Sequence, residues 1–292
     1  MNCKSWMTMV AAMLVIGCGN SDLDPSLGES GADPTLARGV ESDEAELPVD
    51  DEHAALVSDG SDYYNCFKLG TCGSPSLSGS TLCKKDRDYH TAVVDRGSSV
   101  VVLSMHGGLI EPNSSEVARL LADRFGWSRY DLQGHGSASC LGTMDNHQRM
   151  HITATNFNDP EAVELVTSHK KGLAIHGYSD VRGNRRGTLC VGGRNTAQIE
   201  QFIATMNAKK SSFDGYTLTP VNAATTAPRA GVNCSGLTGT ARMNLVNRVK
   251  DEDGGLQLEM SDGIKADLVS PSAQYDELRT VFYAAVSAAM AK

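Results

Sequence analysis

Two apolar runs that each end in His-Gly place the tightest constraint on this chain. Residues 101–105 (VVLSM) lead into His106, residues 173–175 (LAI) lead into His176, and each histidine is followed by glycine. Short runs of this kind are typical of buried strands, and open α/β sheets place their ligands beyond the carboxyl ends of such strands. The two histidines are therefore expected close together at one edge of a sheet.

A carboxylate adds to this pattern, because Glu111 follows His106 by five residues. Gly107 and Gly108 allow the loop between them to fold back. Imidazole nitrogen and carboxylate oxygen are both good zinc donors, and two histidines with one glutamate leave a fourth position for water. We therefore predict zinc bound by His106, Glu111 and His176. Two alternatives stay open: each histidine can be a hydrogen-bonded residue at a strand end, and the same donors can hold another divalent metal.

The rest of the chain alternates short β-branched runs with amphipathic stretches, which is typical of an α/β domain with a buried sheet. Asp159 is predicted to be the N-cap of a helix that has proline in its first turn. A three-layer α/β/α sandwich follows, formed by a single domain over residues 61–292. The predicted strands are 99–105, 149–154, 172–176, 188–191 and 256–260, and the predicted helices are 114–125, 160–168, 196–208 and 273–291.

The first eighteen residues look like an export signal. Lys4 precedes an apolar run that ends in residues 15–18 (VIGC). The run is too short for a permanent membrane-spanning helix, and its final cysteine resembles that of a bacterial lipobox, in which the thiol is acylated. We therefore expect an exported protein, anchored through Cys18 to a bacterial membrane and facing the periplasm or the cell surface. A plain signal peptide is the alternative.

Residues 19–60 differ from the rest of the chain in composition. They consist mainly of Asp, Glu, Ser, Gly and Pro, with 12 acids against one base, Arg38. Such a segment cannot bury enough apolar surface to fold, and we interpret it as a disordered tether. The tether thus carries a formal charge of −11 against −9 for the whole chain, so residues 61–292 are close to neutral. The folded part is therefore able to bind an anionic substrate but is not basic enough to indicate nucleic acid.

Six of the eight cysteines are left once Cys3 is removed with the signal and Cys18 is lipidated. An even number in an exported protein favours disulfides over free buried thiols, and the sequence leaves their pairing open. A zinc ribbon is not indicated, because the six form no C-x2-C pair. They are Cys66, Cys72, Cys83, Cys140, Cys190 and Cys234.

Glu259 lies within the predicted strand 256–260 (LQLEM), where it alternates with apolar residues. A lone glutamate in a strand usually faces solvent. If this strand neighbours the two histidine strands, Glu259 is instead placed to take a proton from a metal-bound water and pass it to a leaving nitrogen.

Six motifs in order connect these residues to a known family. They are SMHGGLIEPNSSE, MHITATNFNDP, AIHG, VGG, NLVNR and GGLQLE, and together they resemble the motif set of the poly-γ-glutamate hydrolases. The resemblance covers about residues 63–292. It implies a fold similar to that of zinc carboxypeptidases, with an open mixed sheet, and cleavage of γ-glutamyl amide bonds. It also implies zinc on His106, Glu111 and His176 and a catalytic acid/base at Glu259.

The resemblance also points to residues that bind substrate. In the NLVNR motif, Arg248 is suited to bind a substrate carboxylate in two parallel hydrogen bonds, and Asn247 is predicted beside it. The alternative for Arg248 is a surface ion pair. His151 is a candidate to line the site, or else a structural histidine. Lys265 stands where the family tends to have arginine and is a further candidate, which affects the choice of substrate more than the reaction.

Two departures from the family pattern lie near the proposed site. The sequence has SMHGG where the family usually has APHGG, and residues 132–140 lack the usual aromatic-rich stretch. We expect Cys140 to fix a reshaped rim through a disulfide.

The function that the resemblance implies is an exported zinc hydrolase of γ-glutamyl amide bonds, most directly those of poly-γ-glutamate. Its expected partners are an anionic γ-glutamyl polymer or peptide and, through the lipid anchor, a membrane. Cell-wall peptides also contain γ-linked glutamate and are an alternative substrate. A binding lipoprotein without turnover is another alternative, although all four proposed catalytic positions hold competent residues. A shared metal site determines the reaction class better than the substrate.

Overall fold

The structure is a computed structural model that describes residues 83, 85–136, 140, 145–178, 187–209, 212–213, 216–228 and 231–292. The described residues belong to one compact unit that extends to Lys292. The predicted leader with Cys18, the acidic segment, Cys66 and Cys72 lie outside the described residues.

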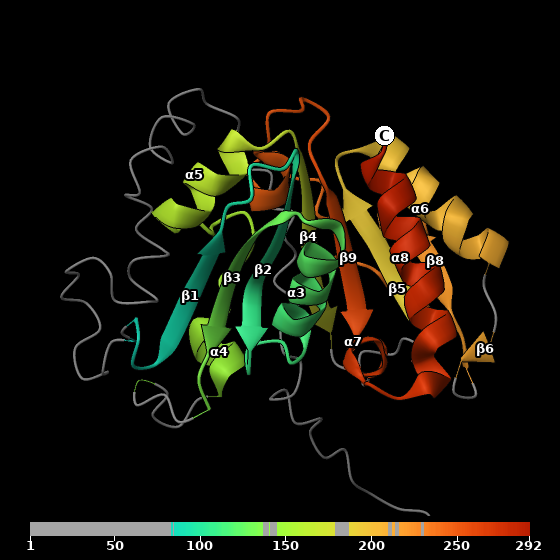
Figure 1. Cartoon of the computed structure of the whole chain (residues 1–292), viewed down its shortest axis with the longest axis horizontal. Coiled ribbons are helices and arrows are strands. Elements are labelled where there is room, and N and C mark those ends of the chain that lie inside the picture. The colour runs from blue at the N-terminus through green and yellow to red at the C-terminus, as the bar shows by residue number, and fades with distance from the viewer. Residues whose placement is uncertain are drawn as a thin grey trace, which may run out of the picture. The chain divides into compact units, whose positions relative to one another are not determined.

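Seven strands form one mixed sheet in the order β1-β3-β2-β4-β9-β5-β8 (Figure 1). β3, β2, β4 and β9 are parallel to one another, β1 and β5 are antiparallel to their neighbours β3 and β9, and β8 is parallel to β5. The carboxyl ends of β2, β4 and β9 therefore meet at one edge of the sheet. The strands are β1 (Tyr89–Val94), β2 (Val100–Gly108), β3 (Ser128–Gly134), β4 (Lys171–Tyr178), β5 (Thr188–Gly193), β8 (Thr219–Asn222) and β9 (Leu256–Ser261), and a separate pair joins β6 (Ser212–Phe213) to β7 (Tyr216–Thr217).

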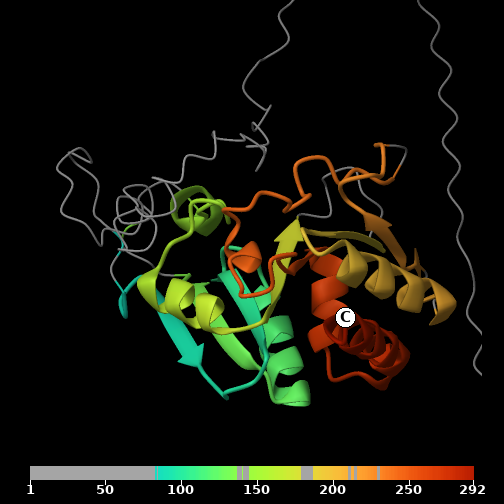
Figure 2. The same ribbon diagram turned by 90° about the horizontal axis from the view of Figure 1, so that it is seen from above.

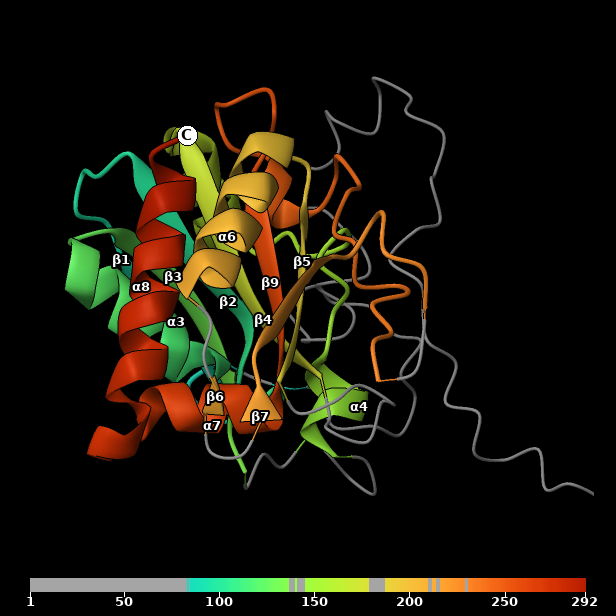
Figure 3. The same ribbon diagram turned by 90° about the vertical axis from the view of Figure 1, so that its right-hand side faces the viewer.

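Helices cover both faces of this sheet. One face packs against α3 (Ser114–Phe125), α6 (Thr196–Lys209), α7 (Asp262–Val269) and α8 (Asp276–Met290), with the 3-10 turn η3 (Ala273–Tyr275) before α8. The other face carries α4 (Asn146–Met150), α5 (Pro160–Ser168) and the 3-10 turn η2 (Leu245–Asn247). In Figure 3, α6 and α8 lie on one side of the central strands and α4 on the other, and Figure 2 shows these layers from above. Over the described part of the chain, no helix has the length and apolarity needed to cross a membrane.

The central strands are apolar on both faces because both faces are covered. In β2, Val100 and Val102 join the core beneath α3 and α8, whereas Val101 and Leu103 join the core beneath α5. Alternate residues of a strand point to opposite faces, so a strand between two helical layers reads as a continuous apolar run. This arrangement explains the uninterrupted pattern that the sequence showed before His106.

Most of the predicted elements are present, and the predicted fold class, a three-layer α/β/α sandwich with an open mixed sheet, is confirmed. Asp159 caps α5, since its side chain accepts the backbone N–H groups of Glu161 and Ala162 at 3.0 and 3.2 Å. Four predicted strands correspond to β2, β4, β5 and β9, and the four predicted helices correspond to α3, α5, α6 and α8.

The strand predicted at 149–154 is wrong, because the chain here completes α4 and continues as an irregular loop. Ile152 and Ala154 are both buried, and this alternation of burial mimics a strand. Their carbonyl groups pair outside any sheet, with Nε2 of His106 and the backbone N–H of Leu245. Alternate residues are therefore buried here although the segment does not pair with a strand.

The sequence prediction missed β1, β3, β8 and α7. β3 carries Asp131 at a fully buried position, where charge argues against a strand. The carboxylate is satisfied inside the protein, because it accepts hydrogen bonds from Ser115 Oγ and Gln133 Nε2. Burial raises the pKa of Asp131 even though these two donors lower it.

Among the residues that the structure describes, two disulfides join distant segments of the chain. Cys83 pairs with Cys140 and Cys190 pairs with Cys234, with Cα–Cα separations of 4.8 and 5.6 Å. The prediction that these cysteines form disulfides is confirmed, including the expected disulfide of Cys140. Cys190 lies in the middle of β5, so its partner loop is fastened directly to the sheet.

Candidate metal centre and active site

A tight loop after β2 brings His106 and Glu111 together. The backbone N–H of Glu111 donates to His106 O at 2.7 Å. Gly108 has a φ of +64° and lies against the backbone of Gly134, and Gly107 has no room for a side chain beside α3. Both glycines are therefore needed for the loop to fold back, as the sequence indicated.

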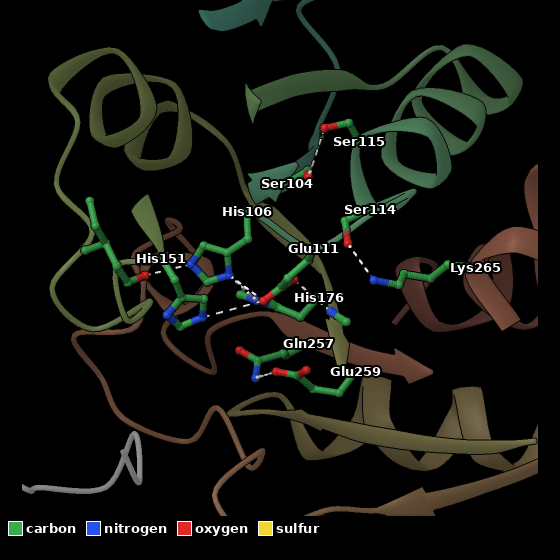
Figure 4. A network of polar contacts seen from close by, with 12 residues as sticks. Ser104, His106, Glu111, Ser114, Ser115, His151, His176, Gln257, Glu259 and Lys265 are labelled. Atoms are coloured by element: carbon green, nitrogen blue, oxygen red, sulfur yellow. Dashed lines mark hydrogen bonds and ion pairs between the residues drawn. The ribbon is translucent and has the colours of Figure 1, made fainter. Parts of the chain in front are cut away.

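His176 reaches the same point from the carboxyl end of β4. Its Nδ1 lies 3.1 Å from Nδ1 of His106 and 3.8 Å from an oxygen of Glu111. All three residues are buried, with at most 6 % of their surface exposed. Figure 4 shows the two rings and the carboxylate converging. The structure thus brings together the three residues that the sequence predicted as ligands.

A contact outside the cluster sets the orientation of the His106 ring. Its Nε2 lies 2.6 Å from Ile152 O, which can only accept, so Nε2 carries a proton. In the neutral ring Nδ1 then carries a lone pair, which faces Glu111 Oε1 at 2.8 Å and Nδ1 of His176. Such lone pairs repel one another unless a cation lies between them. Metal-binding histidines show this arrangement, with the far nitrogen held by a carbonyl or carboxylate.

Glu111 stays ionised at this centre. Burial raises its pKa, but the facing imidazoles of His106, His151 and His176 outweigh burial and hold the pKa well below its ordinary value. Its second oxygen accepts the backbone N–H of Gly177 at 2.8 Å. The centre therefore contains a fixed negative charge.

His151 provides a further nitrogen at this centre, from the loop directly after α4. Its Nε2 lies 3.5 Å from Glu111 Oε1, and its ring centre is 4.0 Å from that of His106. One donor atom from each of these three residues lies within 4.8 Å of the others. Burial, helped by the neighbouring His106, lowers the pKa of His151 to about 3, so this ring is neutral at pH 7. The structure places this site-lining candidate at the cluster itself.

The donor set fits a zinc ion. Ligand atoms around one tetrahedral zinc lie roughly 3–3.5 Å apart, given zinc–ligand distances of about 2.0–2.2 Å. The separations that link His106, Glu111 and His176 run from 2.8 to 3.8 Å. Nε2 of His176 is buried without a hydrogen-bond partner in the described part of the chain, which is unusual for a structural histidine. The predicted cofactor, zinc, agrees with both the donor types and their spacing.

Glu259 lies beside His176 on the neighbouring strand. β4 and β9 are parallel, and His176 is the register partner of Glu259. Because Ile175 and Leu258 pack toward α6 and α8, His176 and Glu259 both point to the opposite face, where Figure 4 shows them close together. Glu259 is only 4 % exposed, so the alternative of a solvent-facing glutamate is excluded.

The carboxylate of Glu259 is held by the amide of Gln257, which is in turn held by the amide of Asn244. Gln257 Nε2 donates to Glu259 Oε1 at 3.0 Å, and Asn244 Nδ2 donates to Gln257 Oε1 at 2.8 Å. Both amide residues are fully buried. The sequence analysis singled out neither of them. The spacing of Gln257 and Glu259 on one strand face is a signal for the first, whereas Asn244 joins the chain of hydrogen bonds only through the fold.

Arg248, predicted to bind a substrate carboxylate, is largely used within the protein. Its Nε donates to Met243 O at 2.7 Å and its Nη2 donates to Thr155 O at 3.0 Å. These bonds join the η2 loop to the irregular loop that follows α4. Neither the two-bond carboxylate contact nor the surface ion pair describes what these two nitrogens do in the structure.

The side chain of Asn247 bonds to several backbone groups. Its Nδ2 donates to Gly239 O and Ala241 O, each at 2.8 Å, and its Oδ1 accepts the N–H groups of Arg194 and Gly255. The side chain is buried and its hydrogen-bonding capacity is engaged. These bonds give Asn247 a role within the protein, and its contact with substrate stays a prediction.

Lys265 lies behind the centre rather than on its open side. The residue is fully buried, and its Nζ contacts Ser114 Oγ and Asp262, each at 3.3 Å. It packs so closely on Gly177 that a Cβ at that position would overlap the ammonium group. The side chain packs against Ser114 and Gly177, and a contact between Lys265 and substrate stays a prediction.

The fold and the site together define a class of protein. A buried cluster of histidine and glutamate donors at the carboxyl edge of a mixed sheet, with an ionisable carboxylate beside it, is the construction of zinc-dependent hydrolases. The chain belongs to the poly-gamma-glutamate hydrolase family, whose model matches residues 80–288. The family resemblance drawn from the motifs is confirmed, together with the hydrolase class that it implied.

Curated relatives include two proteins of Bacillus subtilis (strain 168). The UPF0714 protein YndL is 28 % identical over 62 % of this chain and 60 % of its own length. The UPF0714 protein YmaC is 33 % identical over 41 % of this chain and 45 % of its own length. The matched part of the chain thus spans about half of each relative.

Two solved structures share the fold. A bacteriophage poly-gamma-glutamate hydrolase superposes with a TM-score of 0.54 at 23 % identity, covering 74 % of this chain and 93 % of the phage protein. A zinc-free form of YndL also gives a TM-score of 0.54, at 25 % identity, covering 77 % of this chain and 97 % of YndL. The predicted α/β architecture is therefore confirmed by superposition as well as by the strand order.

Proposed function

We propose that this protein is a zinc-dependent hydrolase that cleaves γ-glutamyl amide bonds, with poly-γ-glutamate as its substrate. The observation that carries the proposal is the register pairing of Glu259 with His176, next to the convergence of His106 and Glu111. This pairing sets a buried proton acceptor beside a set of metal donors. Family membership supports the substrate class.

We assign the metal to His106, Glu111 and His176, as the motifs implied. His176 is the better third ligand because it is buried and its Nδ1 faces that of His106 at 3.1 Å. The side chain of His151 is 24 % exposed. In this assignment His151 lines the open side of the centre as a neutral ring.

The reaction uses a small number of groups. When bound, zinc lowers the pKa of a coordinated water and polarises the carbonyl of the amide to be cleaved. The carboxylate of Glu259 accepts the proton of the attacking water and returns it to the leaving nitrogen. The fixed charge of Glu111 and the neutral state of His151 keep the cluster able to hold a divalent cation at neutral pH.

Gln257 positions this acid/base. Its amide occupies one oxygen of Glu259, and Asn244 in turn fixes the amide of Gln257. The carboxylate is thereby kept from rotating beside the metal donors. Small displacements of a catalytic group cost rate, so these amides are expected to matter for turnover more than for binding.

We also propose that the protein is exported and carries a lipid on Cys18. Support comes from the leader that ends in VIGC and from the two disulfides, which fit an oxidising compartment. Export would give the enzyme access to an extracellular polymer.

The ligand assignment predicts how zinc stabilises the protein. Adding zinc to chelator-treated protein is expected to raise the melting temperature by about 10 °C, because saturating ligand adds roughly 3–4 kcal/mol and each kcal/mol is worth about 2–4 °C. His176→Ala should lose this increase, whereas His151→Ala should keep most of it. Thermal unfolding with and without zinc measures both. A loss in His151→Ala alone would make His151 the third ligand.

Glu259→Gln is expected to lower kcat for poly-γ-glutamate by roughly 10²–10⁴-fold while zinc content stays near one per chain, because the amide cannot accept the proton. Polymer length after incubation and elemental analysis are the two measurements. If the wild type binds zinc, leaves the polymer intact and cleaves γ-linked cell-wall peptides, the substrate is the cell-wall peptide and not poly-γ-glutamate. Full activity of the variant would remove Glu259 from the mechanism.

Gln257→Met is expected to lower kcat by about ten- to a hundred-fold with KM changed less than about two-fold, since the carboxylate loses its positioning donor. Gln198→Met is the matched control, because Gln198 is equally buried and its side-chain amide has no partner in the described ranges. Steady-state kinetics and zinc content are compared for both. Equal losses in the two variants would show that the effect is general destabilisation.

The export proposal predicts the mature N-terminus. Membrane-extracted protein should begin at Cys18 with a mass increase that matches attached acyl chains. Intact mass and N-terminal peptide analysis measure this, with Cys18→Ser as the control that should leave the membrane fraction. An unmodified N-terminus at residue 1 would contradict both export and anchoring.

A further inference from the structure

A hollow lies on the α5 side of the sheet, apart from the metal centre. It has a volume of about 600 Å³ and runs between α5 and the loop that carries η2. Val163 and Thr167 line it from α5, and Met243 lines it from the loop. The residues of the metal cluster do not contribute to this lining, so we treat it as a separate groove, here named the η2 groove.

Cations outnumber anions in the η2 groove. Four basic residues line it against two acidic ones, and one of the acids, Asp251, already accepts the backbone N–H of Asp253 at 3.1 Å. A groove of this balance attracts anions, most strongly at low salt. The charged lining residues are Arg194, Arg242, Arg248, Lys250, Asp251 and Glu252.

The arginines differ in what they already bind. Arg248 is fastened to two backbone carbonyls, which holds it in place at the groove. By contrast, the side chains of Arg194 and Arg242 make no hydrogen bond or ion pair within the part of the chain that the structure describes. A guanidinium group presents five N–H donors in a planar fork that matches a carboxylate. Two such groups are therefore available to carboxylates in one groove.

One continuous segment connects the groove to the metal centre. Ile152 O holds the ring of His106, and Thr155 O, three residues later, accepts the guanidinium of Arg248. Three residues span at most about 11 Å even when fully extended. The His106 ring and the Arg248 guanidinium at the groove are therefore held by one short segment, and only a polymer long enough to cover the distance between them can occupy both places.

We propose that the η2 groove binds the carboxylates of an anionic polymer and takes up chain segments that extend beyond the cleaved bond. The inference rests on the proposed function, since poly-γ-glutamate carries one free carboxylate per unit. The groove adds affinity for long chains without taking part in the chemical step. Long chains are then cleaved more efficiently than short oligomers.

The first test is binding without turnover. Fluorescently labelled long poly-γ-glutamate is titrated into two zinc-loaded proteins. One carries Glu259→Gln alone, and the other carries Glu259→Gln together with Arg194→Gln and Arg242→Gln. The two added changes are expected to weaken binding about ten-fold, because each removes one charge contact with the polymer. Arg119→Gln is the matched control, an exposed arginine on α3 at the opposite face, and should change binding less than two-fold.

The second test is chain-length dependence in the active enzyme. The ratio of kcat/KM for long polymer to kcat/KM for a tri-γ-glutamate is expected to fall about ten-fold in the double variant and to stay constant in Arg119→Gln. Arg242→Gln alone, an exposed position, should give an intermediate fall, which guards against misfolding of the double variant. Melting temperature is recorded for every variant.

The outcomes separate the two proposals. Equal weakening by Arg119→Gln, or an unchanged length ratio in the double variant, would overturn the groove. An equal fall in kcat/KM for the long polymer and for the tri-γ-glutamate would also overturn it, because the arginines would then act at the metal centre. A wild type that cleaves neither substrate would refute the proposed function, while the binding titration would still report on the groove.

Discussion

The hydrogen bond between His106 Nε2 and Ile152 O is the interaction on which the site depends. It decides which nitrogen of His106 faces the other donors, and it comes from a loop rather than from the sheet that carries the histidine. The same loop begins with His151 at the cluster and leads to Thr155, which accepts the guanidinium of Arg248. One irregular segment thus fixes the tautomer of a metal donor and joins the centre to the η2 groove. Because this segment pairs with no strand, its carbonyl groups are available to the side chains of His106 and Arg248.

Strand register supplies the second constraint. β9 lies between β4 and β5, so Glu259 has His176 on one side and Cys190 on the other. A shift of one residue in either pairing would turn Glu259 toward the face that packs against α6 and α8, since neighbouring residues of a strand face opposite sides. The disulfide from Cys190 to Cys234 ties a loop to the strand beside the acid/base. The proton acceptor is therefore placed by the sheet itself, with Gln257 completing its orientation.

Three residues that were predicted to contact substrate use their polar groups for hydrogen bonds within the protein. Asn247, Arg248 and Lys265 all belong to positions that the family resemblance marked, yet their polar atoms mainly serve loops and the wall behind the centre. A buried donor without a partner is costly, and the fold uses these side chains to satisfy backbone groups where regular structure ends. A motif identifies a position that matters but does not say whether its side chain faces a ligand or the protein. Of the arginines that line the η2 groove, Arg248 belongs to a motif, whereas Arg194 and Arg242 lie outside the motifs.

The sequence by itself determined the local features: the two strands that end in histidine, the glycines that let Glu111 return to His106, the capped helix after Asp159, and the apolar strand that carries Glu259. Each is encoded by neighbours within a few residues, through periodicity, glycine conformation or capping. Only the tertiary structure decided that residues 149–154 form no strand and that His151 joins the cluster. It also decided that Asn244 supports Gln257 and that Lys265 is buried against Ser114, a residue 151 positions away. These contacts join segments distant in sequence, and their hydrogen-bond partners depend on strand register and loop packing, which no local pattern records.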